Sequence, residues 1–145
     1  MPVRKKDSVD VTEYVVLLDS VTFLPKTGIV ATNIDLQYTR YRTAPSVKVD
    51  MLALAATDSA HADNKGIEID ATNSPGLWRI DWPDAAFATG VNKVELSIVC
   101  AGVISQKIEV DLTDNDLETA TPTYTLFTIS GTSSNGVLLI QNTGT

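Results

Sequence analysis

Apolar and polar residues alternate along most of the chain, with the period of two that is typical of β-strands. The clearest alternation covers residues 93–100 and 104–113, and the turn Ala101-Gly102 separates these two segments. Side chains two positions apart lie on the same face of a strand, so each segment has one apolar and one polar face. Two such segments joined by a short turn with a glycine predict an antiparallel hairpin.

Shorter stretches of the same alternation predict further strands before this hairpin. Turns are predicted at 23–28 and 63–66, and the Ala-rich stretch 52–62 fits either a continued strand or one or two helical turns. No long segment has the 3.6-residue period of an amphipathic helix. The expected strands cover 9–18, whose second half is apolar on both faces, and then 34–39, 47–51 and 67–70.

The fold class follows from this pattern. Turn signals separate the predicted strands by roughly 8–12 residues, which is typical of an all-β sandwich. Strands with one apolar and one polar face are typical of antiparallel sheets that expose one side to water. We therefore predict an antiparallel β-sandwich of the Ig-like or jelly-roll-like type in residues 11–113.

The block 70–90 holds both tryptophans of the chain between two groups of turn residues. Asn73-Ser74-Pro75-Gly76 predicts a turn, because proline presets φ and glycine accepts a positive φ. Pro83 ends the strand that follows, since it has no N–H for a sheet hydrogen bond. Residues 83–88 then predict one helical turn, which Gly90 closes.

Within this block, residues 77–82 predict a strand with two different faces. Arg79 and Asp81 share one face with Leu77 and are close enough for a modest ion pair. The aromatic face fits either a stacking platform for a sugar ring or part of the core, and the core is favoured because aromatic residues dominate core burial. The predicted core signature is Pro75, Gly76, Trp78, Ile80, Trp82, Pro83 and Gly90.

Composition limits the class of protein. The 145 residues include 43% apolar residues, enough for a single domain without disulfides or metals. The net charge of −7 argues against nucleic-acid binding, and no apolar run is long enough to span a bilayer. The one cysteine, Cys100, excludes an intrachain disulfide, and the basic residues near the N-terminus precede no apolar stretch, so a secretory signal is not expected.

Charge is distributed unevenly between the two ends of the chain. Residues 1–10 form a predicted arm with the basic cluster Arg4-Lys5-Lys6, whereas no Lys or Arg follows Lys107. Residues 114–145 predict an acidic linker followed by a C-terminal β-hairpin extension. The charged ends are either solvated or meet complementary surfaces on neighbouring subunits.

The predicted C-terminal hairpin needs a surface to pack against, because an isolated hairpin is marginal in water. Its strands are expected at 124–129 and 136–141, and it would pack either on its own sandwich or on a neighbouring chain. The candidate interface residues at the two ends of the chain are Arg4, Lys5, Lys6, Tyr124, Leu126, Phe127, Leu138 and Ile140.

No residue pattern predicts catalysis or a cofactor site. His61 lies between Ser59 and Asp63, but nothing places Ser59 on the sharp turn of a nucleophile, so we expect a surface histidine in a loop. Cys100 has no second thiol nearby in the sequence and is expected to be a small buried side chain. We therefore expect no catalytic residue and no cofactor.

An acidic cluster near the C-terminal linker is the only candidate for a metal site. Carboxylate oxygens suit Ca²⁺, but the spacing differs from that of an EF-hand loop and no glycine supplies its sharp turn. A solvated acidic linker is favoured over a metal site. The four residues are Asp111, Asp114, Asp116 and Glu118.

Several of these motifs together resemble a segment of structural proteins from tailed-bacteriophage and prophage virions. The resemblance begins with Phe23–Gly28 and a strand ending Gln37-Tyr38-Thr39-Arg40. It continues with the turn, aromatic strand, Pro-Asp-Ala and Ala-Thr-Gly of Asn73–Gly90, and with the hairpin ending Ile108–Leu112. It covers Val11–Leu112, so both ends of the chain lie outside it. The resemblance implies a β-sandwich module of a viral particle and implies no catalytic residues.

The expected function is therefore that of a non-enzymatic structural protein of a phage virion. A head-decoration or cement protein is the first hypothesis, because the chain is short and has two charged ends suited to bridging subunits. A tail, fibre or baseplate component that binds a host glycan or protein is the alternative. An enzyme such as a depolymerase is disfavoured, because no acid–base pair is recognisable. The expected partners are the major capsid protein or other virion proteins and further copies of the chain, with a trimer as one candidate, and neither nucleic acid nor membrane.

Overall fold

The computed structural model describes residues 2–43 and 45–115. Almost all regular structure in this part of the chain is β, with two short 3-10 helices, η1 (Ala31–Asn33) and η2 (Asp84–Ala86). In chain order the strands are β1 (Val3–Lys5), β2 (Thr12–Val16), β3 (Ile34–Arg40), β4 (Val47–Asp50), β5 (Leu52–Ala53), β6 (Lys65–Asp70), β7 (Ser74–Asp81), β8 (Lys93–Cys100) and β9 (Gln106–Thr113).

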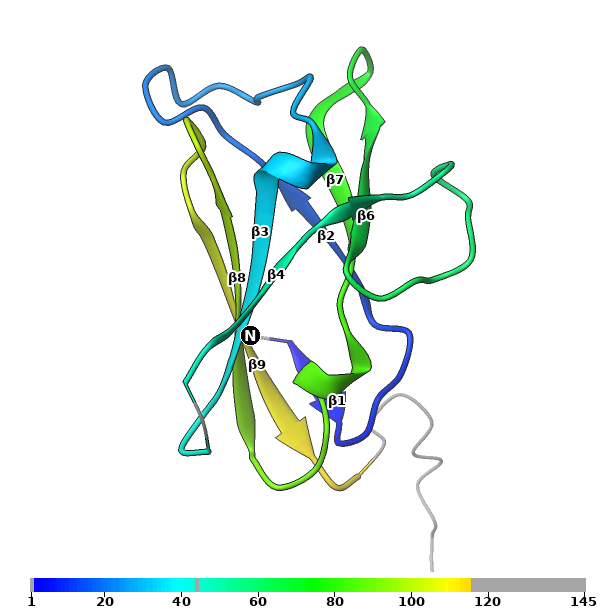
Figure 1. The fold of residues 1–145 in the computed structure, drawn as a ribbon, viewed down its shortest axis with the longest axis vertical. Helices are drawn as coiled ribbons and strands as arrows, with labels where there is room; N and C mark the ends of the chain where they lie inside the picture. The colour runs from blue at the N-terminus through cyan, green and yellow to red at the C-terminus, as the bar shows by residue number, and fades with distance from the viewer. Residues whose placement is uncertain (1, 44, 116–145) are drawn as a thin grey trace, which may run out of the picture.

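These strands form two sheets that pack face to face (Figure 1). One sheet has the order β1-β9-β8-β3-β4 and the other β2-β7-β6-β5. Most neighbouring strands are antiparallel, but β1 runs parallel to β9 and β5 runs parallel to β6. The predicted all-β sandwich is thus confirmed, with a mixed pairing at two edges.

The strand order is that of an Ig-type sandwich. Strands β4-β3-β8-β9 take the places of C′, C, F and G, and β2-β7-β6 take those of B, E and D. In the constant-type Ig arrangement a first strand, A, lies beside B. Here the first strand, β1, pairs with β9 instead, so no described strand pairs with β2 on its open side. The turn Gly102–Ile104 is hydrogen-bonded to Leu18 and Ser20, just beyond the end of β2.

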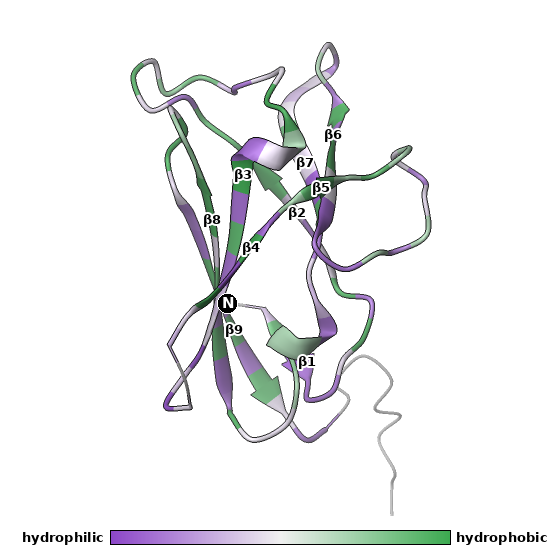
Figure 2. Ribbon diagram, in the orientation of Figure 1, coloured by the Kyte–Doolittle hydropathy of each residue, from purple (hydrophilic) through white to green (hydrophobic). Residues whose placement is uncertain are grey.

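The core lies between the two sheets and follows the alternation of the sequence (Figure 2). Trp78, Ile80 and Trp82 are almost fully buried, which confirms the aromatic strand as core rather than a sugar platform. The predicted hairpin is confirmed as β8 and β9, joined antiparallel from Lys93↔Asp111 to Ile98↔Gln106. Its apolar face contributes Val94, Leu96, Ile98, Val110 and Leu112 to the core.

The turn predicted at 73–76 lies earlier, because the Asp70 side chain organises it. The Asp70 carboxylate accepts hydrogen bonds from the backbone N–H groups of Thr72 and Asn73, at 2.8 and 2.9 Å, and from the Asn73 side chain. The backbone N–H groups of Thr72 and Asn73 thus bond to this carboxylate instead of to a neighbouring strand. Strand β7 can therefore begin at Ser74, with Pro75 and Gly76 inside it.

The helical turn predicted after Pro83 is confirmed as η2. The Ala-rich stretch 52–62 holds only the two-residue strand β5 followed by a loop, without a helix. Lys65 and Gly66, predicted as part of a turn, open β6 instead. A Cβ on Gly66 would lie 2.6 Å from the sulfur of the buried Met51, so only glycine lets β6 approach the core this closely.

Residues 3–5 lie in a sheet and do not extend from the sandwich as an arm. β1 pairs with Asp111–Thr113 of β9, although a sequence of three residues gave no strand signal. The predicted linker and hairpin from residue 116 onward lie outside the described residues. This holds for the candidate interface residues Tyr124, Leu126, Phe127, Leu138 and Ile140, and for the acidic residues Asp116 and Glu118.

Candidate interaction surface

β2 lies at one edge of its sheet, so one side of it has no paired strand among the described residues. Register fixes which of its backbone groups face outward. The Trp82 N–H donates to the Val11 carbonyl, and the Leu17 N–H donates to the Gly76 carbonyl, both at 2.9 Å. Alternate residues of an antiparallel strand point their N–H and C=O to opposite sides. The odd-numbered residues of β2 therefore face β7.

The even-numbered residues Thr12, Tyr14 and Val16 accordingly direct their N–H and C=O groups away from the sheet. We call this row of backbone groups the β2 edge. Their side chains lie on the outer face of the sheet, turned away from the core. Tyr14 is 59% exposed and Val16 is 45% exposed. The half-buried Leu77 lies opposite Val16 on the same face, so the edge borders an apolar strip.

Residues 14–18 are apolar on both faces in the sequence, but this pattern alone does not identify an edge strand. A strand with two apolar faces is usually covered on both sides. In the structure one face of β2 packs on the core, while the other carries Tyr14 and Val16 into solvent. That second apolar face was the signal for an interaction surface.

Further along the same outer face, Arg79 and Asp81 form a buried ion pair, which corrects the expectation of a modest surface pair. The Arg79 Nε and Nη2 atoms donate to the two carboxylate oxygens of Asp81 at 3.0 and 2.9 Å. The Nη1 atom donates to the backbone carbonyls of Thr57 and Ser59. The loop after β5 covers this part of the face, and alternation within β7 could not reveal that cover.

Asp81 holds the centre of this network. The Thr12 hydroxyl donates to it at 2.7 Å and the backbone N–H of Ala62 at 3.1 Å. Burial alone would raise the pKa of the Asp81 carboxyl, but the hydrogen bonds from Arg79, Thr12 and Ala62 outweigh it and hold the pKa below its usual value. The ionised carboxylate therefore fastens the loop to the start of β2.

His61 is enclosed rather than on the surface. Its side chain is only 10% exposed, with Nδ1 at 3.1 Å from the Asp10 carboxylate and Nε2 at 3.3 Å from the Val11 carbonyl oxygen. The Ser59 hydroxyl accepts a hydrogen bond from the Ala56 backbone N–H, and so serves a turn. These contacts give His61 a structural role that joins the loop to the segment before β2.

The remaining candidate groups have internal roles. Cys100 is half-buried rather than fully buried, and burial raises the pKa of its thiol. Asp114 pairs with Lys6 at 3.0 Å, and Asp111 lies 3.7 Å from the Lys93 ammonium. Among residues 2–43 and 45–115, no group of three or more His, Cys, Asp and Glu side chains is arranged to hold a metal.

The basic cluster near the N-terminus meets acidic groups of its own chain. Arg4 donates to Glu13 at 3.1 Å, which links β1 of one sheet to β2 of the other. Lys6 and Asp114 bring the beginning of the sandwich beside its end. The charges at the two ends, which the sequence left either solvated or paired with neighbouring subunits, are thus paired in part within one chain.

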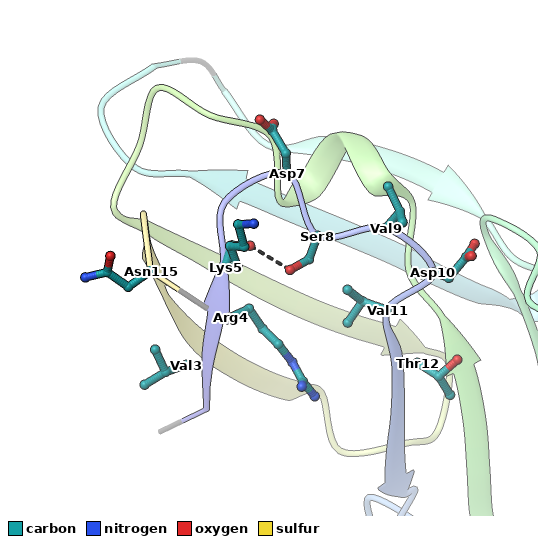
Figure 3. A pocket seen from close by; sticks show the side chains of 10 residues that line it. All are labelled: Val3, Arg4, Lys5, Asp7, Ser8, Val9, Asp10, Val11, Thr12 and Asn115. Atoms are coloured by element: carbon teal, nitrogen blue, oxygen red, sulfur yellow. Dashed lines mark hydrogen bonds between the residues drawn. The ribbon is translucent and has the colours of Figure 1, made fainter. Parts of the chain in front are cut away.

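A shallow groove of about 560 Å³ lies along this connection between β1 and β2 (Figure 3). It combines polar groups with valine side chains, and Asn115 lies at one side of it. Such a mixed, open groove suits a polypeptide segment better than a small molecule, which usually needs an enclosed apolar pocket. The lining residues are Val3, Arg4, Lys5, Asp7, Ser8, Val9, Asp10, Val11, Thr12 and Asn115.

No helix of the described residues is long and apolar enough to cross a membrane. Comparison with models of protein families, with curated proteins and with solved structures found no match to this chain.

Proposed function

We propose that the chain is a non-enzymatic structural protein of a bacteriophage virion, and specifically a head-decoration or cement protein. The observation that carries the proposal is the contrast between its polar groups and its apolar ones. Arg79, Asp81 and His61 are used in internal contacts, whereas Tyr14 and Val16 stay exposed beside an open strand edge. An open strand edge beside exposed apolar side chains is a surface that can pair with another protein chain.

The resemblance of Val11–Leu112 to virion proteins supports the choice of a viral particle. A decoration protein acts by adding buried area across capsid subunits, with roughly 1,200–2,000 Å² for a standard contact. Because many copies bind one capsid shell, their individually modest contacts would together make the shell resist expansion. A compact sandwich with an exposed strand edge fits this mechanism.

The test is a particle that lacks the chain, in the phage or prophage whose genome encodes it. We expect such particles to assemble but to lose infectivity faster on heating or osmotic shock, with tolerance restored by adding the purified chain. Unchanged tolerance would contradict a cement role.

A second experiment locates the chain on the particle. A tag at Thr145, imaged at low resolution, should give label distributed over the head. Label confined to the tail tip or baseplate would contradict head decoration and favour the alternative, a component that binds a host receptor.

A further inference from the structure

We propose that two copies of this chain associate through β2, edge to edge and antiparallel, about a twofold axis at Tyr14. The inference goes beyond the virion assignment and does not require it, because it concerns the purified chain alone, although both draw on the exposed edge at Tyr14 and Val16. The contact would join the two β2-β7-β6-β5 sheets into one continuous sheet.

The backbone supplies the first argument. Thr12, Tyr14 and Val16 direct their N–H and C=O groups to the open side, as the register of β2 with β7 requires. In an antiparallel pair centred on Tyr14, each Tyr14 faces its twin and each Thr12 faces Val16 of the other copy. This arrangement forms about six main-chain hydrogen bonds and leaves no outward group of the strand unused.

Side-chain chemistry supplies the second argument. At a net charge of −7, two copies repel each other, so a self-contact needs a surface free of charge. The outward residues of β2 are uncharged, and the one acidic residue of the strand, Glu13, is turned inward to Arg4. The facing pairs Tyr14–Tyr14 and Thr12–Val16 are of the aromatic and β-branched kinds that stabilise antiparallel strands.

Comparison of the four sheet edges supplies the third argument. Proteins protect edge strands from pairing by making them short or by placing charges on them. β1 has three residues and ends in the exposed Lys5, β5 has only two residues, and β4 carries Lys48 and Asp50. β2 has five residues and none of these features on its outward side. Of the described strands, β2 is therefore the one suited to pairing with a second copy.

Disulfide cross-linking tests the register directly, in the full chain with Cys100→Ser. Facing residues of a hydrogen-bonded antiparallel pair have Cα atoms about 5.5 Å apart, within the range that a disulfide can bridge. Tyr14→Cys should therefore form covalent dimers under mild oxidation. The matched control is Val16→Cys, because the two Val16 residues would be offset by four positions, or about 13 Å, and should not cross-link.

Mixing the Val16→Cys chain with one further variant, Thr12→Cys, checks the same register. Thr12→Cys and Val16→Cys should each stay uncross-linked alone and form a mixed dimer together. Cross-linking of Val16→Cys with itself as readily as Tyr14→Cys, or no cross-linking of Tyr14→Cys, would overturn the proposal.

Sedimentation of the unmodified chain provides the second measurement. We expect a concentration-dependent dimer, weakened about tenfold or more by Tyr14→Lys, because like charges directly opposite each other destabilise a strand pair. Val21→Lys is the control, since Val21 is 81% exposed but lies outside β2. A chain that stays monomeric up to sub-millimolar concentration, or a dimer equally weakened by Val21→Lys, would contradict the assigned edge.

Discussion

Asp81 is the residue on which the outer face of the β2-β7-β6-β5 sheet depends. Its side chain is fully buried, yet it carries a charge, because Arg79, Thr12 and the Ala62 backbone donate to its oxygens. A buried charge is tolerated only when such partners satisfy it. The same carboxylate thereby determines where the loop after β5 lies and how β2 starts.

Replacing Asp81 by Asn should therefore be strongly destabilising. The substitution keeps the shape but leaves the Arg79 guanidinium without its counter-charge, and breaking a buried pair in this way costs about 3–5 kcal/mol. Chemical denaturation of both proteins measures the difference. Asp50→Asn, at an exposed carboxylate of β4, is the control and should leave the free energy of unfolding nearly unchanged. A small effect of Asp81→Asn would show that the pair is not coupled to folding.

The ionisation of Asp81 should also make the free energy of unfolding depend on pH. Hydrogen bonds hold the pKa of Asp81 below its usual value in the folded chain. Its contribution is therefore complete above the unfolded pKa of about 3.9 and is lost as pH falls through the lower, folded value. The difference in unfolding free energy between the wild type and Asp81→Asn should stay constant above about pH 5 and shrink below about pH 4. A difference that grows on acidification would contradict this assignment.

Gly76 determines how the strand elements β2 and β7 meet. It adopts a φ of +71° inside β7, and its carbonyl accepts from Leu17 at the end of β2. Its own N–H donates to Glu68 of β6, and the other Glu68 oxygen accepts from Gly28. A Cβ at this position would lie 2.8 Å from the Leu17 carbonyl oxygen. The glycine is needed both for its backbone conformation and for the close approach.

Two glycine substitutions can separate these requirements. Gly28 has a nearly identical φ of +72°, but a Cβ there would meet nothing within 4 Å. Gly28→Ala should cost only the left-handed conformation, about 1–2 kcal/mol, whereas Gly76→Ala should cost clearly more because the backbone must also move. Thermal or chemical unfolding of the two variants measures this. Equal losses would mean that the contact with Leu17 relaxes freely.

At this scale, sequence predicts what is local and misses what is long-range. The β8–β9 hairpin was predictable because its alternation and its glycine turn lie within residues 93–113. The helix η2 was predictable because Pro83 directly precedes it. The burial of Arg79 and Asp81 was not, because a distant loop covers them. His61 was misjudged for the same reason, since the groups that enclose it, Asp10 and Val11, are some fifty positions away. β1 was missed because three residues carry no periodic signal.

The whole molecule combines a high negative charge with an uncharged association edge. Near the two ends of the described chain Lys6 pairs with Asp114, so this lysine already has a counter-charge within its own copy. Among the described residues, the open β2 edge is the candidate interaction surface. The sequence indicated it only through the second apolar face of residues 14–18. Electrostatic repulsion between two copies therefore weakens their association, whereas pairing of their β2 strands strengthens it.

Self-association should consequently strengthen as salt is added. Raising ionic strength from about 10 mM to about 150 mM shortens the screening length from about 30 Å to about 8 Å and reduces the repulsion, while main-chain pairing is little affected. Sedimentation at both salt concentrations measures the dimer constant. A dimer that weakens with salt would point to ion pairs between charged ends instead.

The parallel pairing of β1 with β9 has a mechanical consequence. The backbone is tied at both ends of this contact, from the Asp111 N–H to the Pro2 carbonyl and from the Lys6 N–H to the Thr113 carbonyl. A force that separates residue 2 from residue 115 pulls these parallel strands past each other, so their hydrogen bonds bear the load together. Pulling Arg40 from Val94, which face each other at one end of the antiparallel β3–β8 pair, would open the bonds one after another. Single-molecule pulling between cysteine handles should give the higher rupture force for the first pair. The sandwich should thus resist tension between residues 2 and 115 better than tension that opens β3 from β8.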